Sequence, residues 1–218
     1  MTLTVITHTQ GKRPELMRRC QSSVEAALPP GATHKIIHTD TYEAWAESRV
    51  RSVMESDIAC FVDDDDEIDP MVLRHCLAAL EGNDLGVACS NEITVMFDGR
   101  KQMPQRIKTY EAIYQSPREV HHLCMIRGKH VDPRIVDDLK ALDGIGADWL
   151  VKASAALTAG AIHVPHDGYF WHVNTPDSDI MRVRMRYMHT MPKLRAILSR
   201  YTGRHGRLPQ WDLDKTPT

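Results

Sequence analysis

The sequence predicts an α/β fold in which helices cover both faces of a mostly parallel β-sheet. Short apolar, β-branched segments alternate with stretches in which apolar residues recur at helical spacing. Such alternation is typical of parallel sheets. Of the 218 residues, 42% are hydrophobic and 26% are charged, so neither a disordered nor a fibrous chain is indicated. The length suits one main core with appendages.

Three strand-and-helix repeats occupy the first half of the chain. The runs that we expect to form strands are residues 3–7, 34–38 and 57–62. The segments with helical spacing are residues 14–28, 42–54 and 70–80. Ligands of such sheets gather at the carboxyl ends of the strands, so we expect the functional residues to follow the strands.

Beyond Leu85 the pattern changes. Residues 92–97 alternate like a strand and lead into Asp98-Gly99, which favours a type I′ turn and predicts a small antiparallel hairpin. Pro192 should kink the last helix, because proline removes a backbone donor. The other expected strands are residues 120–127, 161–164 and 169–173, and the other expected helices are residues 133–142, 148–159 and 178–201.

The end of the chain differs in charge from the rest. The net charge is −2, yet residues 180–211 contain eight Lys or Arg and no Asp or Glu. We therefore expect a main domain, residues 1–175, and a basic, mostly helical extension, residues 176–218. Clustered cations attract nucleic acid or an anionic membrane surface. The alternative is a helix that packs its apolar side on the domain and leaves its cations in solvent. The residues expected to contact a polyanion are Arg182, Arg184, Arg186, Lys193, Arg195 and Arg200.

The five cysteines are scattered and form no Cys-x-x-Cys pair, so we expect reduced thiols in the core. No apolar run approaches the roughly 20 residues that cross a bilayer, and no signal-peptide pattern precedes the first strand. These features favour a cytoplasmic location.

Four consecutive carboxylates, Asp63 to Asp66, follow the third expected strand. Burying part of such a cluster raises its pKa values unless a cation neutralises it, and a divalent ion is a natural counter-charge. Hard oxygen ligands suit Mg²⁺ or Mn²⁺ shared with substrate phosphates. If strand geometry continued, Asp63 and Asp65 would point to one side and Asp64 and Asp66 to the other.

Three alternatives to this metal site exist for the acidic run. A solvated acidic loop is the usual reading of a charge run. An EF-hand loop is disfavoured because Ile68 stands where glycine is needed. An aspartyl phosphatase would carry its nucleophile after the first strand, which here ends in Thr7-His8-Thr9.

These motifs resemble family 2 glycosyltransferases of the GT-A fold. The family opens with a strand, a Thr-rich turn and a helix, and residues 7–16 look like that opening. Its second strand ends in an Asp that reads the nucleotide base, to which Asp40 corresponds. Residues 61–66 are similar to its apolar strand and Asp-x-Asp motif. A nearby segment of the family often contains the motif Ala-Arg-Asn, and of this motif the present sequence keeps only the arginine, Arg49.

Further along, the family carries an Arg, a Glu-Asp pair that opens a helix, a Gly, and an Arg-x-His element. Arg127, Asp148, Gly160 and His172 fall in that order. Two departures matter: Ala147 replaces the usual Glu, and of the last element only the His remains. The resemblance covers roughly residues 4–174 and implies a GT-A, Rossmann-like sheet with a small antiparallel hairpin and a basic helical C-terminal tail outside it.

The resemblance implies a metal-dependent, inverting transfer of a sugar from a nucleotide diphosphate, UDP favoured, to an acceptor hydroxyl. Asp148 would be the catalytic base. The implied metal ligands, for Mn²⁺ or Mg²⁺, are Asp63, Asp65 and His172. The implied donor contacts are Thr7, His8, Thr9, Arg13, Asp40, Arg49, Asp63, Asp64 and Arg127.

The acceptor and the class of activity stay open at this point. If the basic tail binds DNA, the acceptor could be a hydroxymethylated pyrimidine, as in phage-type DNA modification, and the base would have to be flipped out. If it binds a membrane, an envelope polysaccharide acceptor is indicated. A non-enzymatic nucleic-acid-binding module is the alternative from another class, and a sugar nucleotidyltransferase ranks third because residues 11–13 are too short for its Gly-rich loop.

Overall fold

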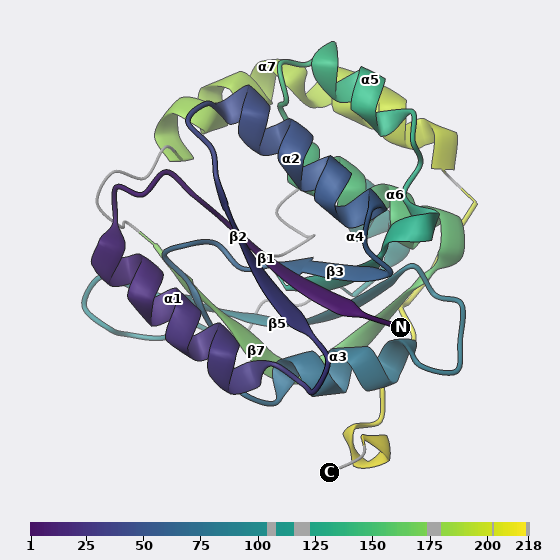
Figure 1. Cartoon of the computed structure of the whole chain (residues 1–218). Helices are drawn as coiled ribbons and strands as arrows, with labels where there is room; N and C mark the ends of the chain where they lie inside the picture. Colours follow the sequence, from purple (N-terminus) through teal and green to yellow (C-terminus); the bar gives the residue numbers. More distant parts are fainter. Residues whose placement is uncertain (104–107, 116–122, 174–179, 202, 217–218) are drawn as a thin grey trace.

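The structure is a computed structural model (Figure 1) that describes residues 1–103, 108–115, 123–173, 180–201 and 203–216. Of residues 180–185 and 187 it describes the backbone alone. Its centre is a seven-stranded sheet with the order β2-β1-β3-β6-β5-β7-β4. The strands are β1 (Leu3–Thr9), β2 (Thr33–His38), β3 (Ile58–Phe61), β4 (Glu67–Ile68), β5 (Val87–Val95), β6 (Cys124–Arg127) and β7 (Ala161–His172).

The sheet is mostly parallel, as the sequence predicts. β1 pairs in parallel with β2 and β3, and β5 pairs in parallel with β7. β6 lies antiparallel between β3 and β5, so β5 and β7 run in the same direction as β3. β4 is a short antiparallel strand at the β7 edge.

Helices cover both faces of the sheet (Figure 1). α1 and α3 lie on one face, and α2, α5, α6 and α7 lie on the other. The helices are α1 (Pro14–Ala27), α2 (Tyr42–Met54), α3 (Val72–Leu80), α4 (Tyr110–Gln115), α5 (Ile135–Lys140), α6 (Ala147–Ala159) and α7 (Ile180–Leu198). Short 3-10 turns follow at Gly128–His130, Ser199–Tyr201 and Leu213–Lys215.

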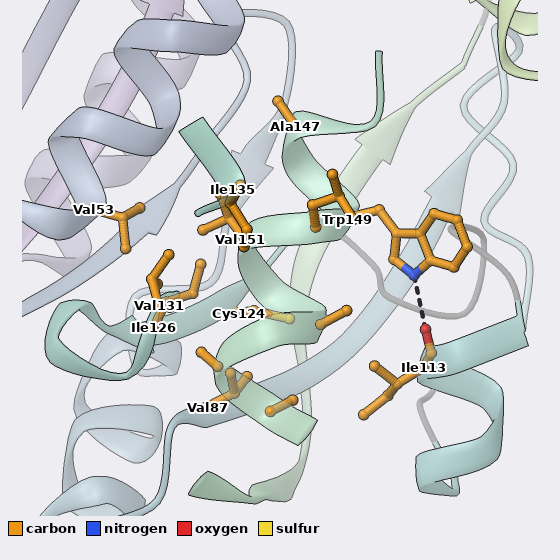
Figure 2. Packing of buried hydrophobic residues seen from close by; sticks show 14 of the residues in the cluster. Val53, Val87, Ile113, Cys124, Ile126, Val131, Ile135, Ala147, Trp149 and Val151 are labelled. Atoms are coloured by element: carbon orange, nitrogen blue, oxygen red, sulfur yellow. Dashed lines mark hydrogen bonds between the residues drawn. The ribbon is translucent and has the colours of Figure 1, made fainter. Parts of the chain in front are cut away.

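Each face of the sheet has its own apolar core, because successive side chains of a strand point to opposite faces. In β1, Val5 packs against the helices α1 and α3, and Ile6 packs against the other layer. Figure 2 shows part of the second core, in which Trp149 and Val151 of α6 pack near the sheet. All five cysteines are buried and none forms a disulfide, which confirms the prediction of reduced core thiols.

β7 is one continuous strand rather than the two short strands expected. Its pairing with β5 shifts register around Asn91, and Pro165 and Gly168 interrupt the apolar pattern in its middle. A Cβ at Gly168 would lie 2.0 Å from Val72 Cγ2, so α3 packs directly on the strand there. β5 also begins at Val87, earlier than the predicted strand.

The hairpin after β5 is reduced to a turn. The Met96 N–H donates to the Arg100 carbonyl at 2.8 Å, and a single antiparallel bridge joins Val95 and Lys101. Of the Asp98-Gly99 pair only Gly99 has a positive φ, 79°, so the type I′ prediction is wrong. Among the described residues no second hairpin strand follows.

The C-terminal helix packs on the domain through its apolar side. Leu194 and Leu198 are fully buried in the core beside α6, while Lys193 and Arg195 are exposed. Pro192 lies on the exposed side of α7, which is not split there but continues from Ile180 to Leu198, so the predicted kink stays a prediction. The boundary expected at residues 174–177 lies outside the described residues. No helix in the described part of the chain is long and apolar enough to cross a bilayer.

The close contact between α6 and the start of β5 can be tested at Gly86. A Cβ added there would lie 2.2 Å from the Ala155 carbonyl oxygen. We expect Gly86→Ala to lower the free energy of unfolding by roughly 1–3 kcal/mol, because a packed interior cannot absorb the extra group without strain. Gly203 has nothing within 4 Å of the same added atom, so Gly203→Ala is the matched control. Equal urea midpoints for the two variants would contradict this packing.

Candidate active site

The carboxyl ends of β1, β2, β3, β5 and β7 meet at one edge of the sheet (Figure 1). This edge carries the end of β1 with His8 and Thr9, the segment after β2 with Asp40, and the acidic run after β3. The end of β7, with His172, lies at the same edge. The structure therefore brings most of the predicted site residues together at the place where ligands of such sheets bind.

The acidic run forms a turn directly after β3. The Asp66 N–H donates to the Asp63 carbonyl at 3.0 Å, so the strand geometry does not continue. Burial nevertheless alternates: Asp64 and Asp66 are 4% and 1% exposed, while Asp63 and Asp65 are partly exposed. We call residues 63–66 the acidic turn.

β7 holds the buried end of the acidic turn. The Tyr169 hydroxyl donates to Asp66 Oδ2 at 2.7 Å, and the His172 N–H donates to Asp66 Oδ1 at 2.8 Å. The same Tyr169 oxygen accepts from the Asp63 N–H at 3.2 Å. Asp66 therefore fixes the turn on the sheet and has its oxygens directed away from solvent.

Asp64 is held from the β1 side. The Thr9 hydroxyl donates to Asp64 Oδ2 at 2.6 Å, and an Arg13 N–H donates to Asp64 Oδ1. Burial raises the pKa of Asp64, and these two bonds oppose that rise. The Thr9 oxygen also accepts from the Gly11 N–H at 3.0 Å, which fixes the loop that leads to α1.

Two arginines supply positive charge to the acidic turn. Arg13, just before α1, also reaches Asp65, with 2.5 Å between Nη1 and Oδ2. Arg49, on α2, lies 2.9 Å from Asp63 Oδ1 through Nη2. The sequence predicts that both arginines contact the donor. In the structure, both form ion pairs with carboxylates of the acidic turn.

Arg49 is buried beneath the turn, at 2% exposure. Its guanidinium lies over the rings of Trp45 and Phe61, with centroid distances of 4.6 Å and 4.2 Å. Its Nε lies 2.9 Å from Asp148 Oδ1. One arginine therefore pairs with a carboxylate of the acidic turn and with the predicted base.

Asp148 lies in the first turn of α6. The helix begins at Ala147, and its N-cap is Gly146 with φ of 88°, so Asp148 is not the capping residue. The next residue anchors the helix start: Trp149 is 1% exposed, and its indole N–H donates to the Ile113 carbonyl at 2.7 Å (Figure 2). Because Trp149 is held in place, the backbone position from which the Asp148 side chain extends is fixed.

His8 lies between the sheet and α2. Its Nε2 is 3.1 Å from Ser48 Oγ, and its ring contacts the rings of Trp45 and Phe61. Burial lowers the pKa of His8 to about 3, and the neighbouring Arg49 charge adds to this. His8 is therefore neutral at physiological pH.

Thr7 and Asp40 differ in accessibility. Thr7 is fully buried, and its hydroxyl lies 2.9 Å from His34 Nε2, inside the α1 side of the sheet. Asp40 is exposed and lies two residues beyond the end of β2. Just before it, the Thr39 N–H donates to the Thr9 carbonyl at 3.1 Å and joins this segment to β1. Asp40 therefore remains available to a ligand, whereas Thr7 supports the strand.

Arg127 lies at the opposite edge of the sheet. Because β6 is antiparallel, its last residue pairs with Ile58 at the beginning of β3. The guanidinium donates to the carbonyl oxygens of Leu80, Asn83 and Leu85 at 2.8, 3.1 and 3.2 Å. The structure therefore does not bring Arg127 to the site where a donor contact was expected.

The expected metal ligands Asp63, Asp65 and His172 all lie at the site edge. Among the described residues, no group of three or more His, Cys, Asp or Glu side chains is placed to hold a metal ion. Asp65 pairs with Arg13, and His172 Nε2 lies 2.9 Å from Glu67 Oε1. Burial lowers the pKa of His172. The metal assignment stays a prediction that rests on the hard oxygen atoms of the turn.

Several residues that build the site were not singled out from the sequence. Arg19 donates to the Asp65 carbonyl at 2.8 Å and lies 2.9 Å from Glu67, and Tyr169 joins two residues of the turn. Of the elements that build the site, only α2 has a sequence pattern that could have indicated these contacts. Its Trp45 and Arg49 are four residues apart, a spacing that puts them on one helix face.

No protein-family model matches the chain, and no curated protein matches it either. The chain is similar in structure to S. aureus TarS. The crystal structure of TarS residues 1–349 in complex with UDP has a TM-score of 0.61 and 16% identity, covering 91% of this chain and 65% of that chain. The complex with UDP-GlcNAc has a TM-score of 0.55 and 16% identity, covering 92% of this chain and 71% of that chain.

A further crystal structure of TarS residues 1–349 has a TM-score of 0.55 and 15% identity, covering 88% of this chain and 66% of that chain. The chain thus spans about two thirds of the length of these structures. The shared fold confirms the predicted Rossmann-like α/β class.

The neutral state of His8 makes stability depend on pH. Its pKa is lower in the folded protein, about 3, than its ordinary value of 6.5, so the unfolded chain binds the proton more readily between these values. The free energy of unfolding should therefore fall as pH drops from about 6.5 towards 3. We expect His8→Asn to weaken this fall, measured by urea unfolding between pH 7 and pH 4.5.

The exposed His189 provides the control for this measurement. His189→Asn should leave the pH slope of the wild type unchanged, because its side chain lies in solvent. If His8→Asn and wild type lose stability in parallel over this range, burial does not keep His8 neutral.

Proposed function

We propose that this protein is a glycosyltransferase that moves a sugar from a UDP-sugar to an acceptor hydroxyl and inverts the configuration at the anomeric carbon. One observation carries the proposal: at the carboxyl edge of the sheet, the buried Arg49 joins the acidic turn to Asp148 at the start of α6. The site therefore combines a carboxylate cluster with a separate carboxylate. The similarity to TarS structures that contain UDP and UDP-GlcNAc supports a nucleotide-sugar donor.

The proposed donor lies along the ends of β1, β2 and β3. Asp40 would contact the nucleotide base, since it is the exposed carboxylate after β2. His8 and Thr9 would form the floor beneath the nucleotide, with Asp63 on the ribose side. Arg13 and Arg49, which hold the acidic turn, would set the position of the diphosphate through that turn.

Charge balance supports a divalent metal. The acidic turn and Asp148 supply five carboxylates, while Arg13 and Arg49 supply two guanidinium groups in contact with them. A diphosphate adds further negative charge. Mn²⁺ or Mg²⁺, held by Asp65 and Asp63 with His172 nearby, would supply the missing positive charge and stabilise the leaving diphosphate.

Asp148 is proposed as the general base. A carboxylate oxygen of Asp148 would take the proton of the acceptor hydroxyl. The hydroxyl oxygen would form a bond to the anomeric carbon as the bond from this carbon to the diphosphate breaks. The side chain is partly exposed, at 27%, and can meet an acceptor from solvent. Attack opposite the leaving group inverts the anomeric centre.

The acceptor that we propose is a hydroxymethylated pyrimidine in DNA. Support comes from the basic extension, residues 176–218, where Arg186 and Lys193 are exposed on α7. Part of its charge is engaged within the chain, because Arg200 pairs with Asp138 and Arg195 donates to the Gln115 carbonyl. The side chains of Arg182 and Arg184 lie outside the described residues. A glycan on an anionic membrane is the alternative acceptor.

Donor binding can be measured directly by thermal shift with a panel of nucleotide-diphosphate sugars. We expect one UDP-sugar to raise the melting temperature in the presence of Mn²⁺ by roughly 5–10 °C at about 100 times its Kd, and to have little effect without metal. Asp65→Ala should remove the metal-dependent shift. A shift that survives in Asp65→Ala would exclude Asp65 as the metal ligand, and no shift with any donor would favour a nucleic-acid-binding module.

Catalysis can be separated from binding with Asp148→Asn. This variant should keep the donor shift and lose transfer by about 10²–10⁴-fold, because it removes the proton acceptor. Asp138→Asn is the matched control, since Asp138 also lies in a first helical turn and pairs with an arginine, but on α5. Normal turnover in Asp148→Asn would assign the base to another group.

Labelled donor then distinguishes the acceptors. Incorporation into hydroxymethylated DNA, with no incorporation into anionic vesicles that carry a lipid-linked glycan, would support the DNA acceptor. The reverse pattern would replace it by the membrane alternative.

A further inference from the structure

Arg49 connects two segments that the proposed reaction uses for different purposes. Its Nη2 lies 2.9 Å from Asp63 Oδ1 in the acidic turn, and its Nε lies 2.9 Å from Asp148 Oδ1 at the start of α6. The acidic turn would hold the donor, and Asp148 would receive the proton. The distance between donor and base is therefore set through one guanidinium.

The surroundings of Arg49 leave it little freedom to move. The side chain is 2% exposed, and its guanidinium lies over both Trp45 and Phe61. A buried guanidinium without a counter-charge is strongly destabilising, so it stays with its two carboxylates. Its planar fork donates a hydrogen bond to Asp63 through Nη2 and forms an ion pair with Asp148 through Nε. A lysine ammonium is a single point charge and cannot reproduce both contacts.

The arginine also has hydrogen-bonding capacity that the protein does not use. Among the described residues, no hydrogen-bond partner is present for the buried Nη1 and Nε atoms of Arg49 or for Asp148 Oδ1. The 2.9 Å contact between Arg49 Nε and Asp148 is therefore an ion pair without hydrogen-bond geometry. Unsatisfied buried donors are rare because they cost free energy. A small shift of Asp63 or Asp148 when a donor binds would satisfy these atoms.

We propose that Arg49 is a positioning residue that aligns the base Asp148 with the donor held at the acidic turn. It acts through these two carboxylates rather than as a phosphate ligand of its own. The effect on catalysis rests on the proposed glycosyl transfer. The link between Arg49 and the two carboxylates does not, and it can be tested without any substrate.

The first experiment measures this link in the free protein. Unfolding free energies are compared for Arg49→Met, Asp148→Asn and the double variant, and for the corresponding cycle with Asp63→Asn. We expect each double variant to be no less stable than Arg49→Met alone, because the carboxylate loses its partner in either case. Additive losses in both cycles would overturn the proposal, whatever reaction the protein catalyses.

The second experiment separates positioning from a structural role. Arg49→Lys keeps the charge but loses the fork, so kcat should fall by about 100-fold while the donor Kd, measured by titration with Mn²⁺, changes by less than about threefold. Arg49→Met should lose turnover further, and the lysine should restore part of it. Arg127→Lys is the control, because Arg127 is also buried but lies at the opposite edge of the sheet. This substitution should leave kcat unchanged.

The outcomes distinguish the inference from the proposed function. An unchanged kcat in Arg49→Lys overturns the inference and leaves the transferase intact. A loss of donor affinity as large as the loss of kcat/KM makes Arg49 a donor ligand and also overturns it. If the wild type neither binds nor transfers any sugar, the proposed function fails, and the unfolding cycles still decide whether Arg49 links the two carboxylates.

Discussion

Four adjacent carboxylates at the end of a buried strand persist only if positive charge lies beside them, and this constraint organises the site. Arg13 comes from the loop before α1, and Arg49 comes from the middle of α2. Both helices must therefore pack so that their arginines reach the same turn. Tyr169 and the His172 backbone then bind the remaining buried carboxylate, Asp66, from β7. The acidic turn thus draws together both helix layers and distant strands.

The sequence predicts the parts of this arrangement that depend on local pattern. The alternating strands and helices of the first half, the position of the acidic run after β3, and the helix that carries Asp148 all follow from periodicity and from the preference of ligands for carboxyl ends. The apolar packing of α7 corresponds to the alternative that the sequence left open for this helix, since Leu194 and Leu198 are spaced for one helix face.

The features that depend on strand direction and on long-range pairing could not be read from the sequence. Arg127 ends a strand, like the other candidates, but β6 runs against its neighbours and carries the residue to the far edge. The sequence predicts two short strands in place of the continuous β7, because Pro165 and Gly168 interrupt the apolar pattern. The pairing of Arg49 with both Asp63 and Asp148 joins three separate segments, and no local spacing encodes it.

The charges of the site bear on how the acidic turn could bind the proposed metal as well as its two arginines. Asp64 and Asp66 are buried and fully engaged by Thr9, Arg13 and β7, so they stabilise the turn itself. Asp63 and Asp65 remain partly exposed and each faces an arginine from one side. A bound diphosphate would approach from the solvent side, where the carboxylates would repel it. In the proposed function, a divalent cation between these two carboxylates and the diphosphate would relieve that repulsion, and the arginines beneath would keep the turn folded when neither is present.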